Sequence, residues 1–325
     1  MRGLTGRARR DERGAVVVVT VAFSVAMVAM AALVVDVGAL HDERRQLQNG
    51  ADAAALAVAH SCALGTCDST LAAGLANANA RDGAAKVDSV VASVASRKVA
   101  VATSTKSSNG GTILPFFFAR AVTGSPGQTV HAKATASWSG ISKAAAIPLV
   151  ISACEWEKAT NGGTTYNTTF TGPISVILFH TGGQAAPDCA AHAGQDSDGD
   201  HRLPGGFGWA DASSCELTFA IGSLIAEAKT GASVLPTCNP ATLVGTTVLV
   251  PIFDDIVGTG TNAKYHIEGF GALRVTGFRF PSTTGGVAPC SSPATCIGGY
   301  FTRFVTPADA TGGPDLGASN VILVS

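Results

Sequence analysis

Residues 14–35 read GAVVVVTVAFSVAMVAMAALVV, a run of 22 residues without a charged side chain. As an α-helix, which rises about 1.5 Å per residue, this run would be about 33 Å long and could cross a hydrocarbon core of about 30 Å. It is too long for a globular β-strand, which usually has about 3 to 10 residues. We therefore predict that residues 14–35 form a transmembrane helix.

Arginines lie on both sides of this run. Five precede it and two follow it: Arg2, Arg7, Arg9, Arg10, Arg13, Arg44 and Arg45. Because basic residues are enriched on the cytoplasmic side of membranes, this bias predicts a cytoplasmic tail at residues 1–13 and an extracytoplasmic body. A cleaved signal peptide with an Ala29-Met30-Ala31 site is the competing interpretation, although its apolar region would normally have about 7 to 15 residues. Both interpretations export the body.

Residues 36–61 read DVGALHDERRQLQNGADAAALAVAHS and change from apolar to amphipathic. Apolar residues at spacings of three, four and seven form one helical stripe: Leu40, Leu47, Ala51, Ala54 and Val58. The other faces carry polar side chains, among them Arg44, Arg45 and Asn49. We predict a juxtamembrane helix over residues 36–60 that continues the span as one long helix. Its stripe would pack either on its own domain or on a partner helix.

The exported part changes composition near residue 142. Before it, residues 61–141 contain an Ala-rich helical segment and strands rich in Val, Ser and Thr, which predicts a small α+β domain. The predicted elements are a helix at 66–84, one or two strands at 87–105, a short helix or buried strand at 113–122, and a strand at 129–139.

Residues 142–148 are Ala-rich and end in a proline, which predicts a linker. Residues 149–325 carry Gly, Thr and Pro between short β-branched runs, which predicts a mainly β domain, either a sandwich or an irregular barrel. We expect strands at 174–180, 246–253, 264–268, 272–280 and 300–306, and one helix at 214–231. The expected fold class is therefore α+β, with a single N-terminal transmembrane helix.

The chain contains eight cysteines, and all of them follow the apolar run. An even number of cysteines in an exported protein is typical of a disulfide framework. Zinc would need C-x2-C pairs or nearby histidines, whereas the close pairs here have C-x4-C and C-x5-C spacing. We expect disulfides rather than zinc or free core thiols. The best candidates for pairing are Cys62 with Cys67 and Cys290 with Cys296.

The overall composition excludes two broad classes of protein. The chain is 46% hydrophobic and only 14% charged, so it lacks the high charge of a disordered protein. Its formal net charge is −1, and the body carries no stripe of Lys and Arg, which excludes nucleic-acid binding through bulk charge.

One acidic turn has the spacing of a cation site. Asp196, Asp198 and Asp200 alternate along the chain and could present their carboxylates to a hard cation such as calcium. The EF-hand pattern fails, because its glycine and glutamate positions hold His201 and Phe207. An exposed acidic turn without a metal is the favoured interpretation, and a calcium site completed by distant residues is the alternative.

The sequence contains neither HExxH nor G-x-S-x-G, two motifs that are typical of hydrolases. We expect a protein that is not an enzyme and that has no cofactor, with calcium at the acidic turn as the one alternative.

Four strings in the N-terminal part form a recognisable combined pattern. They are Glu12-Arg13-Gly14-Ala15, Val35-Asp36-Val37-Gly38, the segment from Glu43 to Asn49, and the segment from Ala51 to Ala57. Together with the apolar run, this pattern resembles the N-terminus of TadG-like tight-adherence (Tad/Flp) pilus-assembly proteins. The later strings Cys154-Glu155-Trp156 and 203–209 (LPGGFGW) are similar to segments of actinobacterial members of that family.

The resemblance implies a bitopic membrane protein that contributes to the structure or assembly of a Tad-type pilus, for adhesion or secretion, without catalysis. Its partners would be the membrane and other pilus-assembly or pilin-like proteins, contacted through the N-terminal helix. We expect topology and helix packing to depend on Arg13, Gly14, Asp36, Arg44, Arg45 and Asn49. Pilin-type processing after Gly14 is not expected, because the fifth residue after it is Val19 and not a glutamate. The alternative function is an exported cell-surface binding module, with calcium at the acidic turn.

Overall fold

The computed structural model describes residues 13–167, 174–179, 187–190, 202–226, 234–258 and 262–324. The fold class is α+β, as predicted, with a long apolar N-terminal helix and a mainly β C-terminal region. The chain forms two compact units. Unit 1 comprises Met1–Ala55, Thr70–Val91 and Ala100–Ala134, and unit 2 comprises Leu56–Ser69, Ala92–Val99 and Thr135–Ser325.

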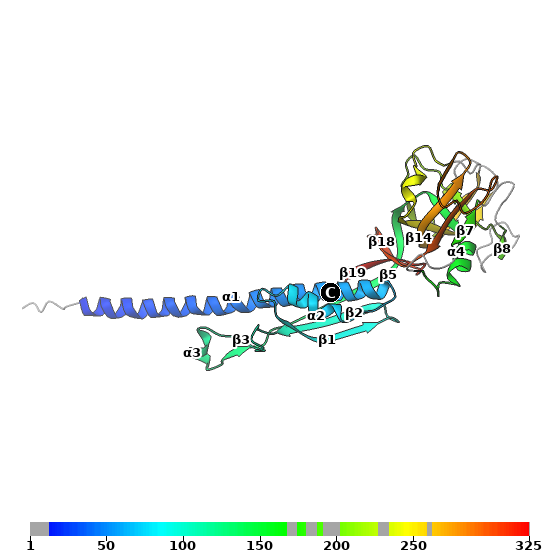
Figure 1. Cartoon of the computed structure of the whole chain (residues 1–325). Coiled ribbons are helices and arrows are strands. Elements are labelled where there is room, and N and C mark those ends of the chain that lie inside the picture. The colour runs from blue at the N-terminus through cyan, green and yellow to red at the C-terminus, as the bar shows by residue number, and fades with distance from the viewer. Residues whose placement is uncertain are drawn as a thin grey trace, which may run out of the picture. The chain divides into compact units, whose positions relative to one another are not determined.

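Helix α1 extends from Arg13 to Ala63 as one uninterrupted helix of 51 residues (Figure 1). The apolar run and the amphipathic stripe are therefore the two parts of a single helix, as the sequence predicts. Gly50 does not break the helix, and the alanine-rich segment that follows it has high helix propensity.

Unit 1 is built on the part of α1 that ends at Ala55. Helix α2 (Leu71–Ala78) and a sheet in the order β1 (Ala85–Ser93), β2 (Lys98–Thr105), β5 (His131–Ala146) complete its core. The buried core residues Leu47, Ala76, Ala85 and Ala132 come from the two helices and two of the strands. Three of these four side chains are alanines, so the elements can approach closely.

A hairpin of residues 114–128, which we name the Phe finger, leaves this unit between β2 and β5. It consists of β3 (Leu114–Pro115), α3 (Ala119–Thr123) and β4 (Gly127–Gln128), and β3 pairs antiparallel with β4. The prediction of a helix or buried strand at 113–122 is only partly right. A short helix is present, but Phe117 and Phe118 remain 70% and 48% exposed.

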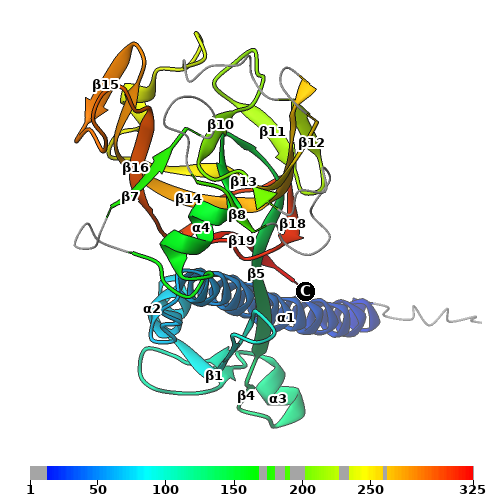
Figure 2. The same ribbon diagram turned by 90° about the vertical axis from the view of Figure 1, so that its right-hand side faces the viewer.

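Unit 2 is mainly β. Its central pair is β13 (Thr247–Val257) with β14 (Lys264–Phe280). The sheet order is β10 (Phe207–Trp209), β6 (Leu149–Ser152), β13, β14, β16 (Cys296–Phe301), β7 (Ser175–Leu178). Residues 264–268 and 272–280, predicted as two strands, lie in the single strand β14. Helix α4 (Ala153–Thr160) lies beside this sheet and adds Trp156 to its core (Figure 2).

The remaining strands of unit 2 complete two sheets. One contains β6 (Leu149–Ser152), β7 (Ser175–Leu178), β10 (Phe207–Trp209), β12 (Leu224–Ala226), β15 (Thr283–Gly286) and β16 (Cys296–Phe301). In the other, β5 pairs with β11 (Leu217–Ala220), β18 (Ala310–Gly313) and β19 (Ala318–Leu323), and β17 (Phe304–Val305) pairs with β19. Two further strands, β8 (Cys189–Ala190) and β9 (Arg202–Leu203), pair with each other, and η1 (Pro240–Leu243) is a short 3-10 helix.

Two local expectations differ from the structure. The helix expected at 214–231 is wrong for its described part, which forms β11 and β12. Gly222 has φ +70° in the turn between these strands, and Phe219 is buried while Thr218 before it is exposed, which is a strand pattern. In the segment predicted as a linker, β5 continues to Ala146, where it pairs with Leu217.

Candidate functional site: the membrane end of helix α1

The first part of α1 has the length and hydropathy to cross a membrane. From Val16 to Ala31 its side chains are exposed, so most of the apolar surface of this segment is open in the described structure. Gly14 also lies in the open: beyond its own neighbours on α1, no described atom lies within 4 Å of the position a Cβ would take. The side chain of Arg13 is outside the described part of the structure. The exposed apolar surface is what single-pass membrane anchoring requires.

Asp36 stands directly after this apolar run and is only 3% exposed. Its carboxylate accepts backbone hydrogen bonds from Phe117 (2.9 Å), from Phe118 (3.0 Å) and from Ala119. Burial acts to raise the pKa of Asp36, but the three N–H donors outweigh it and the pKa is lowered. Asp36 is predicted from the sequence to be a topology residue, and the structure shows that it also holds the Phe finger on α1.

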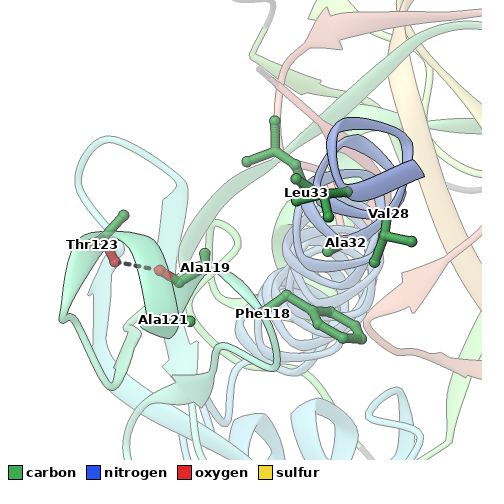
Figure 3. Close-up of a pocket in the computed structure, with 9 residues that line it drawn as sticks. Val28, Ala32, Leu33, Phe118, Ala119, Ala121 and Thr123 are labelled. Carbon is green, nitrogen blue, oxygen red and sulfur yellow. Dashed lines mark hydrogen bonds between the residues drawn. The ribbon is translucent and has the colours of Figure 1, made fainter. Parts of the chain in front are cut away.

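Because of this attachment, the Phe finger lies along the apolar part of α1. A groove of about 320 Å³ separates the two, with Val25, Val28, Ala29, Ala32 and Leu33 on one side and Phe118, Ala119, Ala121 and Thr123 on the other. Figure 3 shows the Phe118 ring extending beside Val28 and Ala32, while Ala121 and Thr123 lie across the opening. The groove has almost no polar lining.

The three other predicted polar residues on α1 have no comparable partners among the described residues. Arg44, Arg45 and Asn49 are exposed. Two residues that sequence analysis did not single out make the longer-range contacts. Gln46 Oε1 accepts the backbone N–H of Arg81 at 2.6 Å, and Gln48 Nε2 donates to the carbonyl of Lys133 at 2.9 Å.

A sequence signal for these glutamines existed but was weak. Each glutamine is four residues from an aspartate, and the structure has both bonds: Gln46 to Asp42 at 2.9 Å and Gln48 to Asp52 at 2.8 Å. Such pairs lie on one face of a helix. The spacing could have indicated that the face was ordered, but not which distant backbone groups it contacts.

The predicted apolar stripe is buried from Leu47 onward. Leu47 is 2% exposed, and Ala51, Ala54 and Val58 are fully buried. Of the two alternatives left open by the sequence, the structure therefore shows that the stripe packs within its own chain. At Gly50 the helices are so close that an added Cβ would lie 3.2 Å from the Cα of Ala76.

The last residues of α1, from Leu56 onward, belong to unit 2 and are held by charge and by a disulfide. Arg303 donates to the carbonyl of Ala63 and to Asp315, both at 3.4 Å, and its guanidinium lies 4.6 Å from the ring centre of Tyr166. A cation at the carbonyl end of a helix is favourable. Burial and the nearby Asp315 raise the pKa of Tyr166 to about 12, and Arg303 acts in the opposite direction.

All eight cysteines are paired. The structure joins Cys62 to Cys67 and Cys290 to Cys296, the two pairs expected from the sequence. The other two pairs are Cys154–Cys189 and Cys215–Cys238. The Cys62–Cys67 pair links the last turn of α1 to the loop that follows the helix.

The predicted calcium residues Asp196, Asp198 and Asp200 lie outside the described residues, so that site remains a prediction. Among the described residues, no group of three or more His, Cys, Asp or Glu side chains is arranged to hold a metal ion. Unit 2 does contain one buried carboxylate that the sequence did not indicate, Asp254, which bonds to His266 Nδ1 at 2.6 Å.

The comparisons with known proteins concern the same helix. Residues 14–61 match the family model described as "Putative Flp pilus-assembly TadE/G-like". No curated protein and no solved structure matches the chain. The matched residues cover the exposed apolar part of α1, Asp36 and the buried stripe. The similarity of the later strings to actinobacterial members of the family stays a prediction. Residues 14–61 are thus similar to the TadE/G-like domain of Flp pilus-assembly proteins, and this likeness concerns helix α1 alone.

Proposed function

We propose that this chain is a membrane-anchored, exported structural or assembly component of a Tad/Flp-type pilus and has no catalytic role. The observation that carries the proposal is the coincidence of the TadE/G-like match with α1. The same 48 residues form the exposed apolar segment and the stripe on which the folded body is built. A helix of this kind ties an exported body to the membrane where the pilus is assembled.

Two features support an extracytoplasmic body with the N-terminus in the cytoplasm. The five arginines up to Arg13 outnumber the two that follow the run at Arg44 and Arg45. The disulfides are all located after the run, and disulfides persist in oxidising compartments.

An accessibility experiment tests this orientation. Arg7→Cys and Val287→Cys variants place one thiol in the tail and one at a 64% exposed site of unit 2. In intact cells, a membrane-impermeant maleimide should label V287C, and it should label R7C only after the inner membrane is opened. The reverse pattern would show that the proposed topology is wrong.

The exposed apolar surface of α1 supports the proposed partners. Helices in a bilayer associate through close packing of small side chains, and Ala22, Ala26 and Ala29 recur on the exposed segment at spacings of four and three. We infer that other Tad components pack against this segment through their own apolar helices.

Exchange of the span in cells that make the pilus tests the function. Replacement of residues 14–35 by a cleavable signal should abolish pilus assembly and release a folded, disulfide-bonded body. An unrelated apolar span of 22 residues is the matched control for anchoring alone. If the control restores pili fully, α1 acts only as an anchor. If it fails, the sequence of the span contacts a partner.

The same experiment separates this proposal from its alternative, an exported surface-binding module. A module that acts only through unit 2 would let pili form normally when the body is freely secreted. That outcome would contradict the assembly role.

A further inference from the structure

The Phe finger has an unusual combination of composition and exposure. Residues 114–128 read LPFFFARAVTGSPGQ and contain one charge, Arg120. Phe117 is 70% exposed, Phe118 is 48% exposed, and the adjoining Ile113 is 41% exposed. Large apolar side chains that remain exposed side by side usually mark a surface that contacts a membrane or another protein.

The position of the finger along α1 fixes its depth. The groove that it forms with α1 extends from Leu33 to Val25. At about 1.5 Å per residue, these positions lie about 5 Å and about 17 Å from Asp36, measured into the apolar run. The finger therefore covers the half of the span that is nearest to Asp36.

This part of α1 cannot lie outside the bilayer if α1 spans it. Without residues 25–35 the apolar run would shrink to residues 14–24, about 17 Å of helix, whereas the hydrocarbon core is about 30 Å thick. The finger is consequently at the depth of lipid acyl chains. This step rests on the membrane anchoring in the proposed function.

Several backbone N–H groups of the finger are hydrogen-bonded within the protein, as a segment inside a lipid bilayer requires. Unpaired peptide groups are costly in lipid. Asp36 accepts the N–H groups of three successive finger residues, Phe116 N donates to Pro126 O, and Gly124 N donates to Arg120 O. Pro115 and Pro126 have no N–H to satisfy. The single guanidinium, on Arg120, is on a long side chain that can extend to the interface.

From these observations we propose that the Phe finger inserts into the half of the bilayer nearest to Asp36, with Phe117 and Phe118 in contact with lipid acyl chains. The chain would then hold the membrane by two elements, the spanning helix and a hairpin that enters from one side. Asp36 would set the depth of the hairpin, because it fixes the start of α3 to a defined position on α1.

Quenching of tryptophan fluorescence by lipids with brominated acyl chains tests this proposal on the full chain in vesicles. The three native tryptophans, Trp138, Trp156 and Trp209, are buried in unit 2 and provide a constant background. A Phe117→Trp variant should lose fluorescence in brominated lipid to a similar extent as a Val34→Trp variant, whose side chain is exposed on the apolar run. A Val287→Trp variant, at an exposed site of unit 2, should lose none.

The outcomes distinguish failure of the finger from failure of the anchor. If V34W is quenched and F117W behaves like V287W, the finger does not contact lipid and the proposal is wrong, while anchoring stands. If neither is quenched, α1 does not span the bilayer and both proposals fail. If F117W is quenched only after dilution of the protein in lipid, a second copy normally covers the finger, which also overturns the proposal. Near-ultraviolet circular dichroism of the buried tryptophans shows that each variant is folded.

Discussion

The carboxylate of Asp36 on α1 accepts the backbone N–H of Phe118 at 3.0 Å, across 82 residues of sequence. With the neighbouring bonds from Phe117 and Ala119, one side chain at the end of the apolar run accepts the N–H groups of the two residues before α3 and of its first residue. An N-terminal helix cap normally comes from the residue just before the helix, but Phe118 at that position makes no side-chain cap bond. Asp36 supplies the cap from another helix.

Replacement of Asp36 by Asn should release the Phe finger without unfolding unit 1. The amide retains one acceptor oxygen but loses the charge that favours three N–H donors, and its NH2 group cannot accept them. Arg120 provides the readout, since trypsin cleaves after arginine in mobile segments. In detergent solution, cleavage after Arg120 should become severalfold faster in D36N than in the native protein.

Asp42→Asn is the matched control. Asp42 is on the same helix and pairs with Arg81 at 3.0 Å, but that pair is exposed, and exposed ion pairs contribute little stability. Cleavage after Arg120 should be unchanged in D42N. Equal rates in D36N and the native protein would mean that the cap does not hold the finger.

Because α1 packs closely on α2, replacing two glycines of α1 by leucine should change the free energy of unfolding in different directions. A Cβ at Gly50 would meet the Ala76 backbone at 3.2 Å, whereas Gly38 has open space around it. Gly50→Leu should lower the free energy of unfolding by about 1–3 kcal/mol, the usual cost of overpacking. Gly38→Leu should leave it unchanged or raise it, because leucine has the higher helix propensity. Denaturant unfolding in detergent compares the two, and equal effects would contradict the close contact.

The sequence predicts the anchor and the stripe well because their signals are local. Twenty-two uncharged residues and a repeat of three and four are visible within one helix, and the structure has both in α1. The strand pattern at residues 217–226 is local too, but the segment contains no proline and can be aligned with a helical repeat. The turn at Gly222 decides between the two, and it depends on pairing with β5 and β14, which are distant in sequence.

The Phe finger was harder to predict for a different reason. Three consecutive phenylalanines indicate burial in a soluble protein, and sequence analysis placed them in a helix or a buried strand. The exposure of Phe117 and Phe118 follows from the attachment to Asp36, and the partners of Asp36 are backbone N–H groups, which have no residue-specific signal. The position of Asp36 directly after the apolar run was the one available sign that it had a role at the membrane end of α1.

Arg303 should be the main polar contribution to holding the end of α1 in unit 2. Arg303→Ala removes the bonds to Ala63 O and Asp315 and the contact with the Tyr166 ring. We expect a loss of about 1–2 kcal/mol in the free energy of unfolding, from cation–π contact and charged hydrogen bonds together. Arg303→Lys, which keeps the charge without the planar group, should lose less. An R303A variant as stable as the native protein would show that the disulfide at Cys62 and Cys67 is sufficient.

The raised pKa of Tyr166 predicts that the protein loses stability at alkaline pH. An unfolded tyrosine ionises near pH 10, whereas burial raises the pKa of Tyr166 to about 12 in the folded protein. Because the folded-state pKa is the higher one, the contribution is fully present below about pH 10 and is lost as the pH rises through about 12. Its hydroxyl is buried and has no hydrogen-bond partner among the described residues, so Tyr166→Phe leaves no donor or acceptor unpaired. Y166F should therefore be at least as stable as the native protein at pH 8, and its free energy of unfolding should fall less between pH 10 and 12. Denaturant unfolding at each pH measures both quantities. Identical alkaline losses in Y166F and the native protein would refute the raised pKa of Tyr166.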